Sequence, residues 1–229
     1  MKKVNQPDCA SCGVPMKERI CRGGKNKAPR TCPTNGRKRL IDQAKKRYED
    51  PEIGEFARQA SIQEGSCYAG RGKKPYIMHP TKPRIQEICE FAGKMGYTRI
   101  GLVFCAGLAR EGLIVGNILK RRGLEVVSVI CKVGGIPKEE IGINEEEKIF
   151  IGEHESMCNP IAQAMIVNDA KVEFNVLLGL CVGHDSLFFQ HAKAPTTVLA
   201  VKDRVTGHSP LAPIYLSGSY YGWISKPGE

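Results

Sequence analysis

Ten cysteines give this chain most of its capacity for chemistry, and four of them lie close together near the start. Cys9, Cys12, Cys21 and Cys32 have the spacing C-x2-C-x8-C-x10-C in a segment with little apolar periodicity. A C-x2-C pair can present two thiolates to one ion, and two later cysteines complete a tetrahedral set, as in structural zinc sites. Pro33 follows the last cysteine, as in bacterial ferredoxin motifs, where thiolates hold an iron–sulfur cluster. The spacing therefore predicts a metal site, for which zinc and a second iron–sulfur cluster are both candidates.

A second group of cysteines follows apolar runs that are typical of buried strands. Cys105 follows RIGLVF (99–104), Cys131 follows LEVVSVI (124–130) and Cys181 follows VEFNVLLGL (172–180). The carboxyl ends of parallel strands meet at one edge of a sheet, and neighbouring strands lie about 4.8 Å apart. We therefore expect these three thiols to converge on one site.

Cys158 extends this group because it precedes Asn159 and Pro160, which predict a helix start. Free backbone N–H groups at such a start favour a thiolate. Cys158 is therefore predicted to be the fourth ligand or the reactive thiol. Each cysteine taken singly could instead be a small core residue.

An iron–sulfur cluster, preferably [4Fe-4S], suits the strand-end site better than zinc, because ligands on separate strands enclose a wider cavity than a compact C-x2-C pair. The predicted cluster ligands are Cys105, Cys131, Cys158 and Cys181. Three cysteine ligands would leave one iron open to a substrate atom. Cys67, in the loop SCYAGRG, is an alternative ligand for the N-terminal site.

Polar residues at the same predicted edge are candidates for proton transfer. Glu111 follows Cys105 in sequence, and His184 and Asp185 follow Cys181. Histidine titrates near neutrality and commonly acts as an acid or base. The predicted catalytic residues are therefore Cys158, His184, Asp185 and Glu111. The segment VKDRVTGHSP (201–210) is predicted to cover the strand-end crevice.

These sites need a scaffold, and the hydrophobic pattern predicts an α/β one. Strand, helix and strand follow one another from residue 99 to residue 130, which indicates a right-handed parallel crossover. We predict a Rossmann-like, mostly parallel open sheet of about four strands with flanking helices, preceded by a small cysteine-rich metal-binding module. The predicted division is residues 1–36 for that module, 37–96 for a helical connecting region and 97–229 for the α/β domain.

The net charge of +10 over 229 residues belongs to the N-terminal part. Residues 1–47 hold fourteen Lys and Arg against three Asp and Glu, or 14 − 3 = +11. Such a block suits the binding of nucleic acid, or it offsets the charge of a four-thiolate metal site.

No apolar run is long enough to span a bilayer and no signal peptide is evident, so a cytoplasmic location, without membrane binding, is expected. There the cysteines stay reduced.

Several motifs together resemble a family of proteins from bacteria and archaea. They are FCAGLAREG, SVICKVGG, MCNPIAQA, GLCVGHDSLFFQHAKAP and VKDRVTGHSP. The chain resembles the uncharacterised family of cysteine-rich putative metal-binding proteins, a domain of unknown function. That resemblance implies metal binding and no particular activity. A fainter similarity, limited to a strand-end cysteine in an α/β fold, is to desulfidases whose cluster three cysteines hold.

Three functions compete. The favoured one is a redox or sulfur-handling role on a small substrate at the strand-end cluster, as an iron–sulfur oxidoreductase or a desulfidase-like enzyme if the protein is an enzyme at all. The alternatives are metal storage, sensing or delivery, and a zinc-containing nucleic-acid-binding module. The expected partner is a small molecule or a redox protein, with nucleic acid less favoured because residues 1–47 lack aromatic side chains for stacking.

Overall fold

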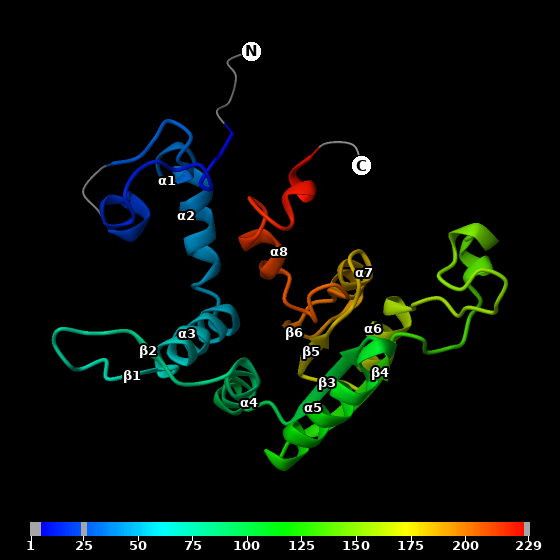
Figure 1. Ribbon diagram of the computed structural model, residues 1–229. Helices are drawn as coiled ribbons and strands as arrows, with labels where there is room; N and C mark the ends of the chain where they lie inside the picture. Colours follow the sequence, from blue (N-terminus) through cyan, green and yellow to red (C-terminus); the bar gives the residue numbers. More distant parts are fainter. Residues whose placement is uncertain (1–5, 24–26, 227–229) are drawn as a thin grey trace. The chain divides into compact units, whose positions relative to one another are not determined.

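The computed structural model describes residues 6–23 and 27–226, and the chain divides into two compact units, 1–64 and 65–229 (Figure 1). The first unit is helical. Its elements are short 3-10 helices at Met16–Glu18 and Ile20–Arg22, and the helices α1 (Pro33–Gly36), α2 (Lys38–Arg47) and α3 (Pro51–Ser66), which runs just past the boundary. Asp50 caps α3, because its carboxylate accepts hydrogen bonds from the backbone N–H groups of Glu52 and Ile53. The division into three parts made from the sequence stays a prediction.

The second unit contains the predicted α/β fold, which the structure confirms. Four parallel strands form one sheet in the order β4-β3-β5-β6. The strands are β3 (Arg99–Phe104), β4 (Glu125–Ile130), β5 (Phe174–Leu178) and β6 (Thr196–Ala200). The helices are α4 (Arg84–Met95), α5 (Ala109–Arg121), α6 (Pro160–Asp169), α7 (His184–His191) and α8 (Leu211–Tyr215). An antiparallel pair of two-residue strands, β1 (Tyr68–Ala69) and β2 (His79–Pro80), precedes them.

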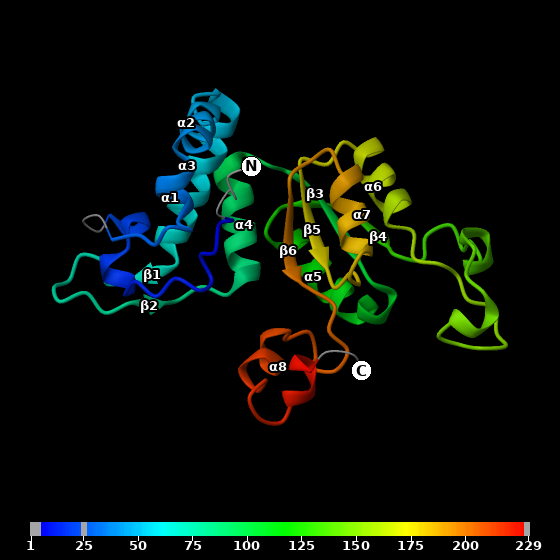
Figure 2. The ribbon, with the colours of Figure 1, turned by 90° about the horizontal axis from the view of Figure 1, so that it is seen from above.

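The connections fix which helices cover which face of the sheet. The chain passes from β3 to β4 in one direction and then crosses back over β3 to reach β5. Right-handed crossovers therefore place α5 on one face and α6 and α7 on the other. Figure 2 shows α6 and α7 side by side against the sheet, and the two helices pack together.

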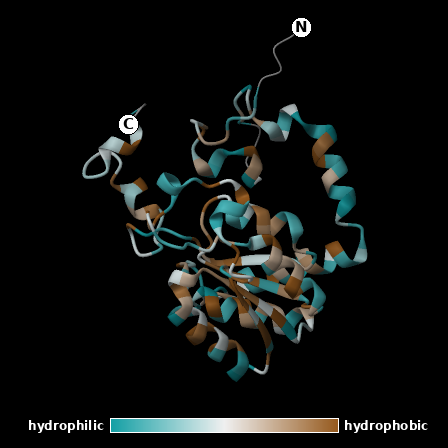
Figure 3. Ribbon diagram, turned by 90° about the vertical axis from the view of Figure 1, so that its right-hand side faces the viewer, coloured by the Kyte–Doolittle hydropathy of each residue, from teal (hydrophilic) through white to brown (hydrophobic). Residues whose placement is uncertain are grey.

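The core of the second unit follows the period-two alternation of the strands. Apolar side chains from the strand interiors and from α6 and α7 pack in one cluster, and the strands form the most hydrophobic part of Figure 3. Phe188 of α7 is fully buried there. On the opposite face of the sheet, the ring of Phe91 in α4 lies 5.6 Å from the ring of Phe174 in β5. The sheet is therefore covered on both faces, as its apolar strands require.

One boundary differs from the prediction for a local reason. The run 172–180 is a strand only over Phe174–Leu178, because Gly179 has φ +68° and leaves the extended conformation. α7 begins at His184, directly after Gly183, which has φ +85°. In the part of the chain that the structure describes, no helix has the length and apolar character needed to cross a membrane.

Candidate functional site

The carboxyl ends of the two neighbouring strands β3 and β4 bring the first two cysteines together. Val103 of β3 and Val129 of β4 face the core beneath α6. Cys105 comes two residues after Val103, and Cys131 comes two residues after Val129. Because side chains along a strand alternate with period two, the cysteines point to the same face as the valines and belong to the same core cluster. The side chains of the two cysteines are hydrogen-bonded.

Cys158 joins them because the start of α6 is tied to the end of β4. The backbone N–H of Asn159 donates to the carbonyl of Cys131 at 2.7 Å. The Asn159 side chain accepts a hydrogen bond from the Ala162 N–H and caps the helix. The Sγ atoms of Cys158 and Cys131 consequently lie 3.7 Å apart.

The three sulfurs form a row with Cys131 in the middle, and we call Cys105, Cys131 and Cys158 the cysteine triad. Cys131 is 2% exposed and Cys105 is 8% exposed, whereas Cys158 is partly exposed. The Ala106 N–H donates to the Cys131 sulfur at 3.2 Å. Solvent therefore reaches the triad most easily at Cys158.

Hydrogen bonds and nearby cations favour thiolates at the two outer positions. The pKa of Cys105 is lowered to about 5, mainly by the hydrogen bond with Cys131 and less by the Gly107 N–H and the Lys202 ammonium, against the opposing effect of burial. The pKa of Cys131 is raised, because its hydrogen bonds to the outer cysteines and its burial favour the thiol. The triad is thus a buried thiol beside two sulfurs that favour the ionised form.

Cys158 owes its acidity to a different set of neighbours. The pKa of Cys158 is lowered to about 6, mainly by the hydrogen bond with Cys131 and less by the charges of Lys132 and His184, against the effect of burial. The Lys132 ammonium donates to the Ser156 carbonyl, which holds that cation beside the loop that leads into Cys158. Sequence reasoning missed Lys132, although it directly follows a predicted ligand.

Cys181 stands apart from the triad in the described part of the chain. After Gly179 leaves the extended conformation, Leu180 enters the core instead of Cys181. The Arg204 guanidinium donates to the Cys181 sulfur at 3.1 Å. The predicted set of four strand-end ligands therefore comprises Cys131 in contact with Cys105 and Cys158, and Cys181, whose sulfur accepts a hydrogen bond from Arg204.

The C-terminal segment reaches the strand ends, as predicted for residues 201–210. Lys202 contacts Cys105 and Arg204 contacts Cys181. Between them, the Asp203 carboxylate accepts hydrogen bonds from the N–H groups of Val205 and Thr206, which folds the segment into a tight loop. The loop presents two cations beside the cysteines. The two cations lie at the ends of β3 and β5. The strand order reverses between these two strands, and open α/β sheets bind ligands at such a reversal.

The predicted acid–base residues take separate positions. Glu111 is exposed in the first turn of α5. His184 begins α7, and its Nδ1 atom is buried without a hydrogen-bond partner. The Asp185 carboxylate accepts from the Ser186 N–H at 2.8 Å. Of these residues, His184 has a described electrostatic effect on the triad, through Cys158.

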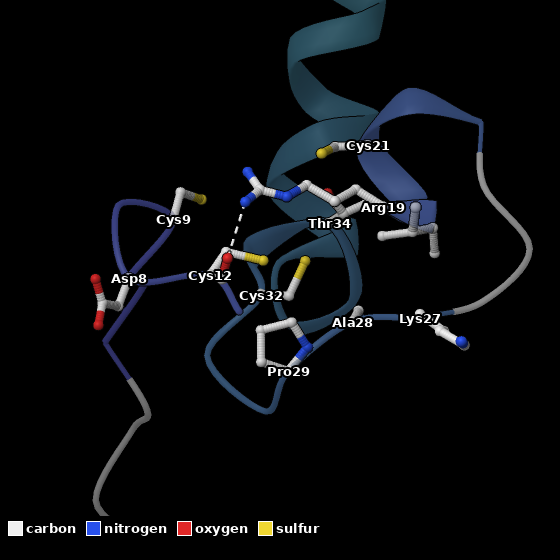
Figure 4. A pocket seen from close by; sticks show the side chains of 11 residues that line it. Asp8, Cys9, Cys12, Arg19, Cys21, Lys27, Ala28, Pro29, Cys32 and Thr34 are labelled. Atoms are coloured by element: carbon white, nitrogen blue, oxygen red, sulfur yellow. Dashed lines mark hydrogen bonds between the residues drawn. The ribbon is translucent and has the colours of Figure 1, made fainter. Parts of the chain in front are cut away.

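The four N-terminal cysteines line one small pocket. Figure 4 shows Cys9, Cys12, Cys21 and Cys32 around a cavity of about 50 Å³, with Arg19 among them. The Arg19 guanidinium donates to the carbonyls of Val14 and Cys12, each at 2.8 Å. Burial raises the pKa of Cys32, but hydrogen bonds from Thr34 and Asn35 outweigh it and lower that pKa overall. The four cysteines thus lie around one pocket, and their binding of a metal stays a prediction.

The fit to a metal ion rests on the donors at both sites. Thiolates are the ligands that zinc, copper(I) and iron–sulfur clusters prefer. A tetrahedral ion with metal–sulfur bonds of about 2.3 Å separates its sulfurs by about 3.8 Å, close to the 3.7 Å between Cys131 and Cys158. Across residues 6–23 and 27–226, however, no three His, Cys, Asp or Glu side chains are already arranged around a single ion. Metal binding at either site therefore requires side chains to change rotamer.

Cys67 and Cys89 lie in the second unit and are both buried. Burial raises the pKa of Cys89 in α4, as suits a core residue. The suggestion that Cys67 ligates the N-terminal metal stays a prediction.

Comparison with known proteins gives a family without a known function. Residues 32–199 match the family described as protein of unknown function (DUF1847), and the chain belongs to this family. The matched residues include the whole triad and exclude Cys9, Cys12 and Cys21. The chain is also similar to the uncharacterized protein MJ0455 of Methanocaldococcus jannaschii, with 38% identity over 207 residues that make up 90% of this chain and 93% of that protein.

Proposed function

We propose that this member of the DUF1847 family is a cysteine-ligated metalloprotein whose strand-end centre performs redox or sulfur chemistry on a small substrate. The observation that carries the proposal is the row of three sulfurs at neighbouring strand ends, with two of them 3.7 Å apart. A purely structural cysteine has no need of an adjacent one. A row of three at the ends of β3 and β4, near cations and next to the reversal of strand order between β3 and β5, suits a centre that binds and reacts.

Cys105, Cys131 and Cys158 are the residues that would hold the metal. An iron–sulfur cluster would supply electron transfer or an open iron site, whereas zinc would act as a Lewis acid. Lys202 is held beside Cys105 and would help to neutralise a thiolate-rich centre and to bind an anionic substrate. His184 has an unpartnered buried Nδ1 and is the candidate to donate a proton or a fourth ligand.

The N-terminal pocket is proposed to hold a second metal with a structural role. Among residues 6–23 and 27–64, Gln63 is the one buried residue, so this unit lacks a hydrophobic core. Thiolate ligation can supply folding free energy in place of a core, as it does in zinc fingers. Zinc suits this role, because it has no redox chemistry of its own.

Metal analysis of single-site variants separates the two centres. The protein is purified anaerobically, and iron, zinc and acid-labile sulfide are measured together with the visible spectrum for wild type, Cys105→Ala and Cys12→Ala. We expect Cys105→Ala to lose the strand-end metal and to keep the N-terminal one, and Cys12→Ala to do the reverse. Cys89→Ala is the matched control, because Cys89 is a buried cysteine outside both sites.

The same measurements can reject the proposal. If wild type and Cys105→Ala hold the same metals, the triad binds none and the strand-end metal centre is wrong. If wild type contains zinc without iron, and Cys12→Ala loses all of it, a zinc-stabilised storage or binding module becomes the better account.

A further inference from the structure

The contact between Cys131 and Cys158 suggests a second activity that needs no metal. We propose that Cys158 and Cys131 form a dithiol–disulfide couple that reduces a small anionic disulfide. This inference uses the same cysteine triad as the proposed function, but it concerns the metal-free protein and stands or falls by a separate measurement.

Geometry supports the pair as a couple. A disulfide needs the sulfurs to move from 3.7 Å to about 2.05 Å. The backbones are already joined by the hydrogen bond from the Asn159 N–H to the Cys131 carbonyl. Rotation about the Cα–Cβ bond of each cysteine, which moves its Sγ atom, is therefore the main change, and the helix start stays in place.

The solvent exposure of the two side chains indicates which cysteine meets the substrate and which one resolves the mixed disulfide. Cys158 is partly exposed, so it can meet a substrate, whereas Cys131 is 2% exposed and can attack only a sulfur that is already bonded to its neighbour. Cys105 also contacts Cys131, but it is buried and is held by the Gly107 N–H and Lys202. Cys105 therefore orients the Cys131 thiol and does not meet the substrate.

The reaction balances in two exchanges. In the first, the Cys158 thiolate attacks one sulfur of the substrate disulfide, a Cys158–substrate disulfide forms, and one thiolate leaves. In the second, Cys131 attacks the Cys158 sulfur and releases the other half of the substrate, which departs as a thiol with the Cys131 proton. Two electrons pass from the cysteine pair to the substrate, and the protein ends with a Cys131–Cys158 disulfide.

The cations around the site indicate the charge of the substrate. Lys132 acts on Cys158, Lys202 contacts Cys105 and Arg204 contacts Cys181. In the described part of the chain, none of these three forms an ion pair with a carboxylate, so their charges face the sulfurs. An anionic disulfide should therefore react faster than a cationic one.

The test uses the full chain after chelation, with metal analysis to confirm that it is metal-free. Oxidised glutathione is added anaerobically, the reaction is stopped with acid, free thiols are alkylated, and the disulfides are mapped by mass spectrometry. We expect a Cys131–Cys158 disulfide in wild type and in the control Cys89→Ser. Cys131→Ser should stop with glutathione on Cys158, and Cys158→Ser should form neither product.

Two results would overturn the inference. Wild type that keeps glutathione on Cys158, or that forms disulfides only among the N-terminal cysteines, shows that Cys131 does not resolve the mixed disulfide. A rate with cystamine, a cationic disulfide, that equals or exceeds the rate with oxidised glutathione removes the assignment of an anionic substrate. Since metal content is measured on untreated protein, either proposal can fail without the other.

Discussion

The acidity of Cys158 gives a sharp prediction for the metal-free protein. Its pKa of about 6 lies roughly three pH units below the ordinary 9.0 of a cysteine, and the hydrogen bond with Cys131 is the largest lowering effect. Replacing Cys131 with alanine removes that bond. We expect the pKa of Cys158 to rise by more than one pH unit, because burial then opposes ionisation against the smaller lowering effects of Lys132 and His184.

The pH profile measures this change better than a single rate does. At pH 7 a group with a pKa of about 6 is roughly nine-tenths ionised, whereas one with a pKa of 9.0 is about one-hundredth ionised. A thiolate of lower pKa is also a weaker nucleophile, and over three pH units this costs about 20-fold in rate. The two effects nearly cancel, so rates at pH 7 differ by only about fivefold. The midpoint of the profile has no such cancellation.

The assay is alkylation by iodoacetamide between pH 4.5 and 10 on chelated protein, with the Cys158 peptide quantified by mass spectrometry. Wild type and Cys89→Ala should give a midpoint near the pKa of about 6. Cys131→Ala should give a clearly higher one. Equal midpoints in wild type and Cys131→Ala, or a wild-type midpoint near 9, would refute the account of a thiolate stabilised by its neighbour.

Two further predictions concern the scaffold around the site. Gly179→Ala should destabilise the fold by about 3 kcal/mol, because a Cβ at φ +68° would lie 2.0 Å from the Leu108 side chain, and the melting temperature should fall by roughly 10 °C. Lys148→Met should open the loop 138–155 to limited proteolysis at pH 7. The Lys148 side chain is 3% exposed, and its ammonium pairs with Glu139 and Glu145, which methionine cannot do. Lys148 lowers the pKa of both glutamates, so the pairing is complete above their ordinary pKa and is lost as pH falls; the variant and wild type should then be cleaved alike in acid.

The sheet could be predicted because its two central strands, β3 and β5, are buried on both faces. The runs IGLVF (100–104) and VLLGL (176–180) are continuously apolar, and a chain has few other ways to bury them. The meeting of Cys105 and Cys131 followed from the same reasoning, since each stands directly after a strand and those strands are neighbours. The N-terminal pocket was indicated by the spacing C-x2-C-x8-C-x10-C, because thiolates at such spacing can reach a single ion.

The membership of the triad could not be predicted from the strands. The sequence gives no sign that Gly179 turns the chain before Cys181, or that Arg204 then binds that sulfur. Its position before a helix start places Cys158 in the expected group, but the sequence does not show the hydrogen bond from the Asn159 N–H to the Cys131 carbonyl that sets Cys158 beside Cys131. Both outcomes depend on backbone conformation and on partners far away in the chain, which residue type and spacing do not encode.

The raised pKa of Cys131 links the two proposed activities of the triad. While Cys131 keeps its proton, only the outer cysteines favour the thiolate form. A metal ion that binds all three must displace that proton, and its own positive charge supplies the means, since coordinated thiols are deprotonated. A disulfide between Cys131 and Cys158 removes the same proton with two electrons instead. Because one sulfur cannot do both, metal binding should protect Cys131 from disulfide formation, and oxidation should release the strand-end metal.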